Sequence, residues 1–144
     1  MYGFSHHADT RNHYKETNPG IGIRKHLGEC FGYILPTANC FAEVSYIDQN
    51  SVGGKVYIAS IGSKWTVFTT SNGYNFHVGG TLDYIRYENP VKGKTYVGIA
   101  PIPFIGIGKG PLDMDVSIIS RNPLKALTGK ESKAVFLLYF TYKF

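Results

Sequence analysis

The stretch Ala134-Val-Phe-Leu-Leu-Tyr-Phe-Thr-Tyr-Lys-Phe144 decides the fold. Read as a β-strand, it has one apolar face and one mixed face, because successive side chains of a strand point to opposite sides. The apolar face consists of Phe136, Leu138, Phe140, Tyr142 and Phe144, and the mixed face of Tyr139, Thr141 and Lys143. A wide aromatic face is typical of a transmembrane β-barrel, where one face meets lipid and the other meets the lumen. A soluble sheet can also end in such a strand, so this stretch leaves both environments open.

Length and composition set the class. The 144 residues form one domain, residues 1–144, and eight strands of about ten residues with short connections fit that length. Aromatic residues make up 15% of the chain, charged residues only 17%, and glycines number 17. This composition favours β-structure over helix or disorder.

Eight strand-like stretches alternate with polar or Gly- and Pro-containing connections. They are residues 2–9, 20–28, 40–48, 55–68, 76–88, 95–108, 112–120 and 134–144. The segment 29–39 is ambiguous between an extension of the second stretch and a turn at Pro36. Short links, many strands and no covering helices suit closure of the sheet on itself. The sequence therefore predicts an all-β, eight-stranded antiparallel up-and-down β-barrel, which we expect to be transmembrane.

Several strands pair a smooth apolar face with a face that carries carboxylates. In the seventh stretch, Leu112, Met114 and Val116 oppose Asp113 and Asp115. In a soluble barrel the apolar face would be the core and the acids would be solvated. In a membrane barrel the apolar face would meet lipid and the acids would line the lumen. Alternation alone does not choose between these two orientations.

Location and partners follow from charge and from hydrophobic runs. No apolar run is long enough for a transmembrane helix, and no signal peptide is visible before the polar segment that starts at Ser5. An outer-membrane location therefore requires an export signal outside this chain. The net charge of +5 is scattered, which disfavours nucleic acid and suits anionic lipid head groups. Cys30 and Cys40 are equally compatible with a hairpin disulfide and with two thiols. No metal-ligand spacing occurs, so we expect neither metal nor cofactor.

One rim of the expected barrel collects residues suited to acyl transfer. His6 and His7 close the first strand, and Asp48, Asn50 and Ser51 follow the third. Two strands that flank the same antiparallel neighbour run in the same direction, so both groups would reach the same rim. Strand alternation turns His7 inward, where it could act as a base on a hydroxyl and be oriented by a carboxylate. The alternative is that residues 48–54 are an ordinary turn of turn-forming residues.

Prolines interrupt the sixth expected strand at Pro101 and Pro103, and Pro111 opens the seventh. Each proline lacks a backbone N–H for the ladder. In a soluble sheet this pattern marks an edge or a bulge. In a membrane barrel it would mark a lateral gap through which a lipid chain could enter.

Several segments, in order along the chain, resemble the family of PagP-type lipid A palmitoyltransferases. They are His7-Ala8, residues 14–22, Tyr46-Ile-Asp-Gln-Asn-Ser51, Asn75-Phe-His-Val-Gly79, residues 101–111 and the aromatic C-terminal strand. The likeness spans most of the chain, and the order of the segments carries it rather than any one motif.

The resemblance implies a monomeric barrel of the bacterial outer membrane that moves a palmitoyl chain from a phospholipid to lipid A. His7 and Ser51 would match the family's catalytic pair, with Asp48 or Asn50 at its Asp position. Pro19, Pro101, Pro103 and Pro111 would mark lipid access. Two departures are the missing N-terminal amphipathic helix and Asn50 in place of Asp. The alternatives are a non-catalytic envelope or lipid-binding barrel and a soluble β-barrel binding module.

Overall fold

The computed structural model describes residues 3–7, 17–30, 38–50, 53–120 and 134–142. Within these ranges the chain forms one antiparallel up-and-down sheet with the strand order β2-β1-β9-β8-β7-β6-β5-β4-β3. The strands are β1 (Gly3–His7), β2 (Thr17–Asn18), β3 (Gly20–Cys30), β4 (Ala38–Ile47), β5 (Val56–Thr69), β6 (Tyr74–Asn89), β7 (Lys94–Lys109), β8 (Leu112–Ser120) and β9 (Ala134–Tyr142). No helix long and apolar enough to cross a membrane is found in this part of the chain.

The all-β fold and its antiparallel up-and-down order confirm the class predicted from alternation. Each expected strand overlaps an observed one, with ends that differ by a few residues. Two details differ. The short strand β2 lies in the expected first connection, and β7 continues through Pro101 and Pro103 without a break. Residues 31–37, the centre of the ambiguous segment, lie outside the described ranges.

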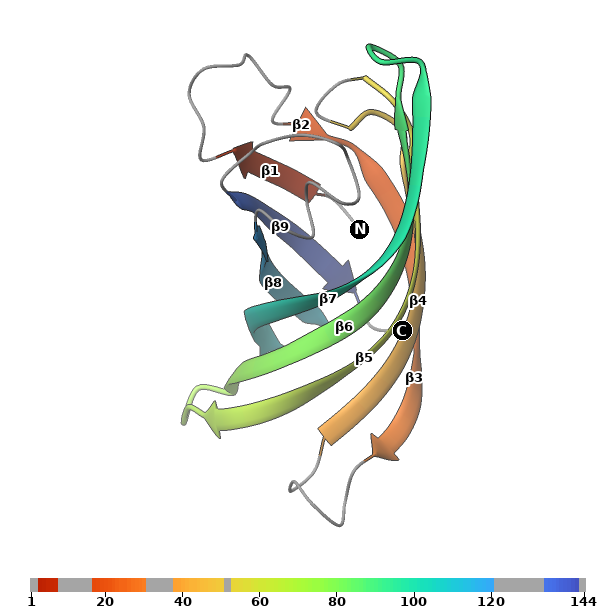
Figure 1. Ribbon diagram of the computed structural model, residues 1–144. Helices are drawn as coiled ribbons and strands as arrows, with labels where there is room; N and C mark the ends of the chain where they lie inside the picture. Colours follow the sequence, from red (N-terminus) through yellow and green to blue (C-terminus); the bar gives the residue numbers. More distant parts are fainter. Residues whose placement is uncertain (1–2, 8–16, 31–37, 51–52, 121–133, 143–144) are drawn as a thin grey trace.

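The sheet curves strongly into a half-barrel (Figure 1). β8, β9 and β1 lie across an interior from β3, β4 and β5, and side chains from both sides meet in that interior. β2 pairs with β1, β3 pairs with β4, and Pro19 alone separates β2 from β3 in the chain. The first and last members of the strand order are therefore neighbours in sequence.

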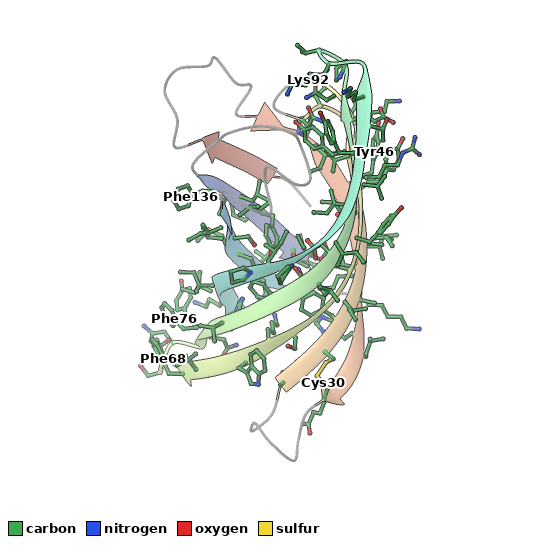
Figure 2. The ribbon with its side chains drawn as sticks, viewed as in Figure 1. Cys30, Tyr46, Phe68, Phe76, Lys92 and Phe136 are labelled. Atoms are coloured by element: carbon green, nitrogen blue, oxygen red, sulfur yellow. A yellow bond between two sulfur atoms is a disulfide. The ribbon has the colours of Figure 1, made fainter. Side chains whose placement is uncertain are left out.

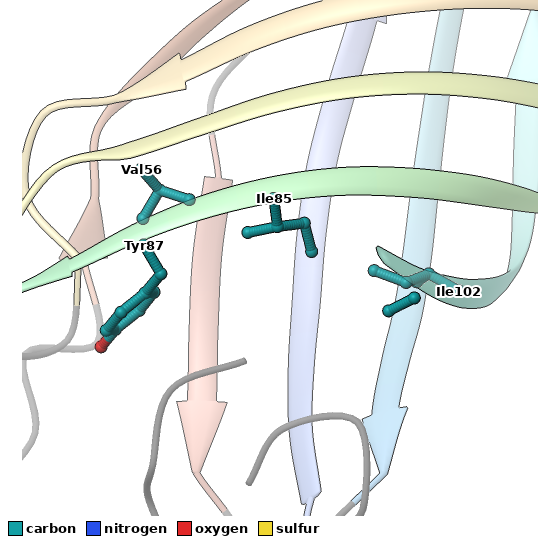
Figure 3. Packing of buried hydrophobic residues seen from close by; sticks show 5 residues of the cluster. Val56, Ile85, Tyr87 and Ile102 are labelled. Atoms are coloured by element: carbon teal, nitrogen blue, oxygen red, sulfur yellow. The ribbon is translucent and has the colours of Figure 1, made fainter. Parts of the chain in front are cut away.

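Side chains sort by strand alternation into an outer apolar face and an inner face rich in polar groups. Ile23, Val44, Ile61 and Ile99 are all at least 60% exposed, whereas Asp83, Asp113 and Asp115 are buried. Buried apolar residues gather inside as well, in a cluster of Val56, Ile85, Tyr87, Ala100 and Ile102 (Figure 3). The expected orientation with apolar faces outward and carboxylates enclosed is the one observed.

The strand ends define two rims. β1, β4, β6 and β8 end at the upper rim of Figure 1, and β3, β5, β7 and β9 end at the lower rim. Two lower connections are tight turns, with positive φ at Gly73 and Gly110, where glycine avoids the steric cost of a Cβ. Tyr46 and Lys92 lie toward the upper rim and Phe68 and Phe76 toward the lower one (Figure 2).

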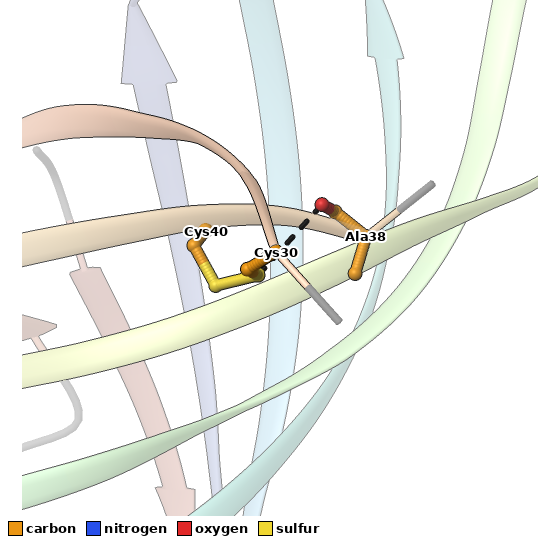
Figure 4. The surroundings of a disulfide bond; sticks show 3 residues. All are labelled: Cys30, Ala38 and Cys40. Atoms are coloured by element: carbon orange, nitrogen blue, oxygen red, sulfur yellow. Dashed lines mark hydrogen bonds between the residues drawn. A yellow bond between two sulfur atoms is a disulfide. The ribbon is translucent and has the colours of Figure 1, made fainter. Parts of the chain in front are cut away.

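A disulfide joins Cys30 at the end of β3 to Cys40 near the start of β4, with 5.7 Å between the two Cα atoms (Figure 4). The bond decides between the two states that the sequence left open. It lies at the lower rim beside Ala38, whose carbonyl oxygen is 3.7 Å from the Cys30 sulfur. A disulfide of this kind persists in oxidising compartments.

We predict that a Cys30→Ser/Cys40→Ser variant unfolds at lower urea concentration than the oxidised wild type. Closing so short a loop removes disorder from the unfolded chain and stabilises the fold by about 2–3 kcal/mol. The single tryptophan, Trp65, gives a fluorescence signal for the titration. Equal midpoints for the variant and for wild type with its bond verified by thiol titration would contradict this prediction.

Candidate functional site

The inner face is organised around the carboxylate of Asp115 on β8, which is completely buried. Its Oδ1 lies 2.6 Å from Nε2 of His77 on β6, and its Oδ2 lies 3.5 Å from an Nη of Arg24 on β3. β3 and β8 lie on different sides of the interior, so the Arg24–Asp115 contact spans the lumen. His77 therefore faces the lumen and hydrogen-bonds to a buried carboxylate there.

Arg24 connects this carboxylate to the rest of the interior. Its Nε donates a hydrogen bond to Oε2 of Glu43 at 2.7 Å, and its guanidinium lies 4.2 Å from the ring centroid of Phe41. The Phe41 ring in turn lies 6.2 Å from that of Phe104, on the opposing part of the sheet. Arg24, Phe41 and Phe104 therefore form a row of neighbouring side chains inside the half-barrel, from β3 to β7.

A second ion pair spans the lumen nearer the lower rim. Nζ of Lys64 on β5 lies 2.5 Å from Oδ2 of Asp113 on β8, and both side chains are buried. Gly106 and Gly108 on β7 make room for the acids of β8. A Cβ on Gly106 would meet the Asp115 carboxylate and the His77 ring, and one on Gly108 would meet Asp113. Buried charges are costly unless they are paired, and each of these acids has a cation or His77 within reach.

Above this polar cluster the interior contains a mostly apolar cavity of about 100 Å³. Arg24, Glu43, Asp83, Ser117 and Tyr139 contribute to the end nearest the cluster, where the Ser117 hydroxyl lies 3.2 Å from the Tyr139 hydroxyl. The walls nearer the upper rim are aliphatic and consist of Ile47, Ile58, Ile85, Ile102, Ile119 and Leu137. The cavity can hold a slender apolar group, and the ion pairs close its lower end.

The two rim segments singled out from the sequence do end on the same side of the sheet. Five strands lie between β1 and β4 in the strand order, which makes six antiparallel pairings, so the two strands run in the same direction. The His7 backbone pairs with Val135. The side chain of His7 and the whole of Ser51 lie outside the described part of the structure, and no distance between them is stated.

Asp48 and Asn50 occupy different environments at this rim. Asp48 is exposed and accepts a 2.7 Å hydrogen bond from the Tyr46 hydroxyl. Asn50 is buried; its amide donates to the Glu88 carbonyl oxygen at 2.7 Å and accepts from the Gly54 backbone N–H at 3.1 Å. The Asn50 side chain thus holds the turn after β4 against β6, which is the structural role that turn-forming residues predicted.

The prolines fall in three settings. β7 pairs with β6 along its whole length, whereas its ladder with β8 ends at Phe104, next to Pro103. Pro101 and Pro103 therefore lie where β7 has lost its β8 partner among the described residues. Pro19 separates β2 from β3. Pro111 lies in the turn closed by the Lys109–Leu112 pair, where the ladder has no interruption.

Among the described residues, no group of three or more His, Cys, Asp or Glu side chains could hold a metal ion. Searches of protein-family models, of curated proteins and of solved structures found no match to this chain.

Sequence reasoning placed the acids in the lumen but missed the cations that pair with them. Arg24 and Lys64 were available as signals, because each falls on the inner face when the strand is numbered by alternation. A buried acid requires a counter-charge on the same enclosed surface. Pairing the inward acids with inward cations across the lumen would have pointed to this cluster.

We predict that Asp115→Ala destabilises the folded protein by about 3–5 kcal/mol, because it leaves Arg24 and His77 buried without their shared carboxylate. Urea unfolding followed by Trp65 fluorescence measures the change. Glu29→Gln, at an exposed position at the lower end of β3, is the control and shifts stability by less than about 0.5 kcal/mol. Equal effects of the two substitutions would show that the Asp115 contacts are not what stabilises the interior.

Proposed function

We propose that this protein is an outer-membrane acyltransferase that moves a fatty acyl chain, palmitoyl in the family it resembles, from a phospholipid to lipid A or a related acceptor. The observation that carries the proposal is the combination of an outward apolar face with an apolar cavity on the inner side, above the charged cluster around Asp115. The first feature suits lipid as the surroundings, and the second suits an acyl chain as the occupant.

The proposed barrel has eight strands and is closed. β2 and β3 count as one strand bent at Pro19, and the pairing of β2 with β1 supports closure because it joins the two ends of the strand order. Closure satisfies the backbone groups of every strand, which hydrocarbon demands because it offers no hydrogen bonds.

Aromatic residues on the outer face support a membrane-spanning orientation. Tyr46 and Tyr57 lie 5.1 Å apart between ring centroids near the upper rim, and Phe68 and Phe76 stack at 4.4 Å near the lower rim. From Tyr57 to Phe68 a tilted strand rises roughly 30 Å, close to the apolar band of membrane barrels. Two tight lower turns and a disulfide at the same rim suit a periplasmic side.

The same burial pattern disfavours the soluble binding module. A soluble barrel would enclose its aliphatic faces and expose its acids to water. Here Ile23 is 74% exposed while Asp115 is fully buried. Water would have to solvate the aliphatic face of the whole sheet.

Catalysis would take place at the upper rim. A hydroxyl oxygen of the acceptor attacks the ester carbonyl carbon of the phospholipid while His7 accepts the hydroxyl proton. The tetrahedral intermediate then collapses, and the bond between the carbonyl carbon and the glycerol ester oxygen of the donor breaks. This oxygen, now part of the lysophospholipid, takes the proton from His7. Ser51 and Asp48 would orient these groups. The acyl chain would lie in the cavity and enter beside Pro101 and Pro103, where the β7–β8 ladder ends.

A second candidate function is a lipid-binding barrel of the same shape without catalysis. The use of Asn50 as a turn-holding residue favours it, because direct alignment with the family puts Asn50 at the catalytic Asp position. Asp48 then remains as the carboxylate of the segment from Tyr46 to Ser51, and it is exposed.

We predict that the folded chain transfers a labelled palmitoyl chain to lipid A in detergent, and that His7→Ala and Ser51→Ala each lower the rate by about a hundredfold or more. Both variants should retain the heat-dependent gel migration of a folded barrel. No transfer by wild type would remove the enzyme assignment and favour the lipid-binding barrel, and full activity in both variants would remove the residue assignments.

A matched pair of substitutions on β5 tests the cavity. Ile58 lines the cavity, whereas Ile61 lies on the outer face of the same strand and is 61% exposed. Ile58→Trp should reduce palmitoyl transfer at least tenfold and shift the preference to shorter acyl chains. The larger side chain would occupy the part of the cavity that the end of a long acyl chain needs. Ile61→Trp should leave both properties unchanged. Equal activity in the two variants would place the acyl chain elsewhere.

A further inference from the structure

Lys25 on β3 is a charged residue that lies among aliphatic side chains of the outer face. It shares a face with Ile21 and Ile23, and it is exposed. It pairs with Ala42, which pairs with Ile61. On β5, Ile61 lies four residues from Tyr57 and four from Trp65. Lys25 therefore lies in the same row of cross-strand pairs as Ile61, which is midway along β5 between these two aromatic residues.

Lys25 opens onto a hollow in this face, which we call the outer groove, lined by Ile23, Lys25, Ala42, Val44, Ala59 and Tyr84. The hollow exists because Ala42 and Ala59 are small while their neighbours are large. A second hollow continues it toward the upper rim past Tyr46 and Tyr57. The groove thus has the shape and apolar walls to take an extended hydrocarbon chain, with an ammonium group at one end.

Within the described part of the chain, Lys25 has neither an ion pair nor a hydrogen bond to another residue. An ionisable side chain at such a position in a membrane protein is costly and usually has a specific partner. A second copy of this chain would not supply one through the same face. The outward positions of β4 to β8 between Tyr57 and Trp65 carry no Asp or Glu.

We propose that the outer groove binds an anionic glycerophospholipid, with one acyl chain along Ala42 and Ala59 and the phosphate paired with the Lys25 ammonium. The proposal rests on the membrane-spanning orientation of the proposed function. The site lies on the other side of the β3–β5 wall from the apolar cavity, so its occupant is separate from the chain held inside.

Native mass spectrometry of the full chain, folded and released from mixed micelles, tests the site. The probes are phosphatidylglycerol and phosphatidylcholine with identical acyl chains. Wild type should retain phosphatidylglycerol preferentially, and Lys25→Gln should lower that retention roughly fivefold. Lys25→Arg should keep it, and Ala59→Leu should reduce retention of both lipids by filling the groove. Lys109→Gln is the matched control, because Lys109 lies 4.4 Å from the Tyr74 ring centroid at the lower rim.

The outcomes separate this site from the proposed function. Flotation with lipid vesicles tests membrane insertion first, and a chain that does not float contradicts the membrane-spanning proposal itself. A chain that floats but retains the two lipids equally, or loses no phosphatidylglycerol on Lys25→Gln, overturns the lipid site alone. If the protein forms dimers and Ala59→Leu dissociates them, the groove binds a second copy of this chain. That result would overturn the lipid assignment as well.

Discussion

The buried carboxylate of Asp115 is the constraint on which the rest of the interior depends. It contacts His77 on β6 and Arg24 across the lumen. Arg24 in turn pairs with Glu43 and lies over the Phe41 ring. Buried ions are stable only with partners in good geometry, so these contacts fix the register in which β3, β6 and β8 meet. These contacts also require a glycine at position 106, because a Cβ there would collide with both Asp115 and His77.

This ionic plug divides the interior into two parts with different uses. Below and around it, the lumen is filled by charged and aromatic side chains, and above it, aliphatic walls enclose a cavity. The outer face is mostly aliphatic, with Lys25 and Tyr84 among its other side chains. The hydrophobic effect therefore does not drive a single core here. It gathers a small apolar cluster inside, around Val56, Ile85 and Ile102, and leaves an aliphatic outer face exposed. Under the proposed function, that face would lie in hydrocarbon and an acyl chain would fill the cavity.

Alternation in the sequence was sufficient to predict the strands, because a period of two is a local property that each segment carries by itself. It placed Asp113 and Asp115 on one face of their strand and Met114 on the other. It did not predict the partners of these acids, because Lys64 and Arg24 lie far away in the chain and meet them only through the curvature of the sheet. The unbroken course of β7 through Pro101 and Pro103 was also missed, since its ladder with β6 holds the strand where the β8 ladder has ended.

Quenching of single tryptophans by brominated lipid chains tests the inside-out orientation most directly. In a Trp65→Phe background, a tryptophan at position 61 should be quenched strongly in vesicles of brominated lipid, because this position points outward. A tryptophan at position 58, three residues earlier on the same strand and on the inner face, should be nearly unaffected. Strong quenching at 58 with none at 61, or none at either position, would contradict the arrangement of lipid outside and charge within.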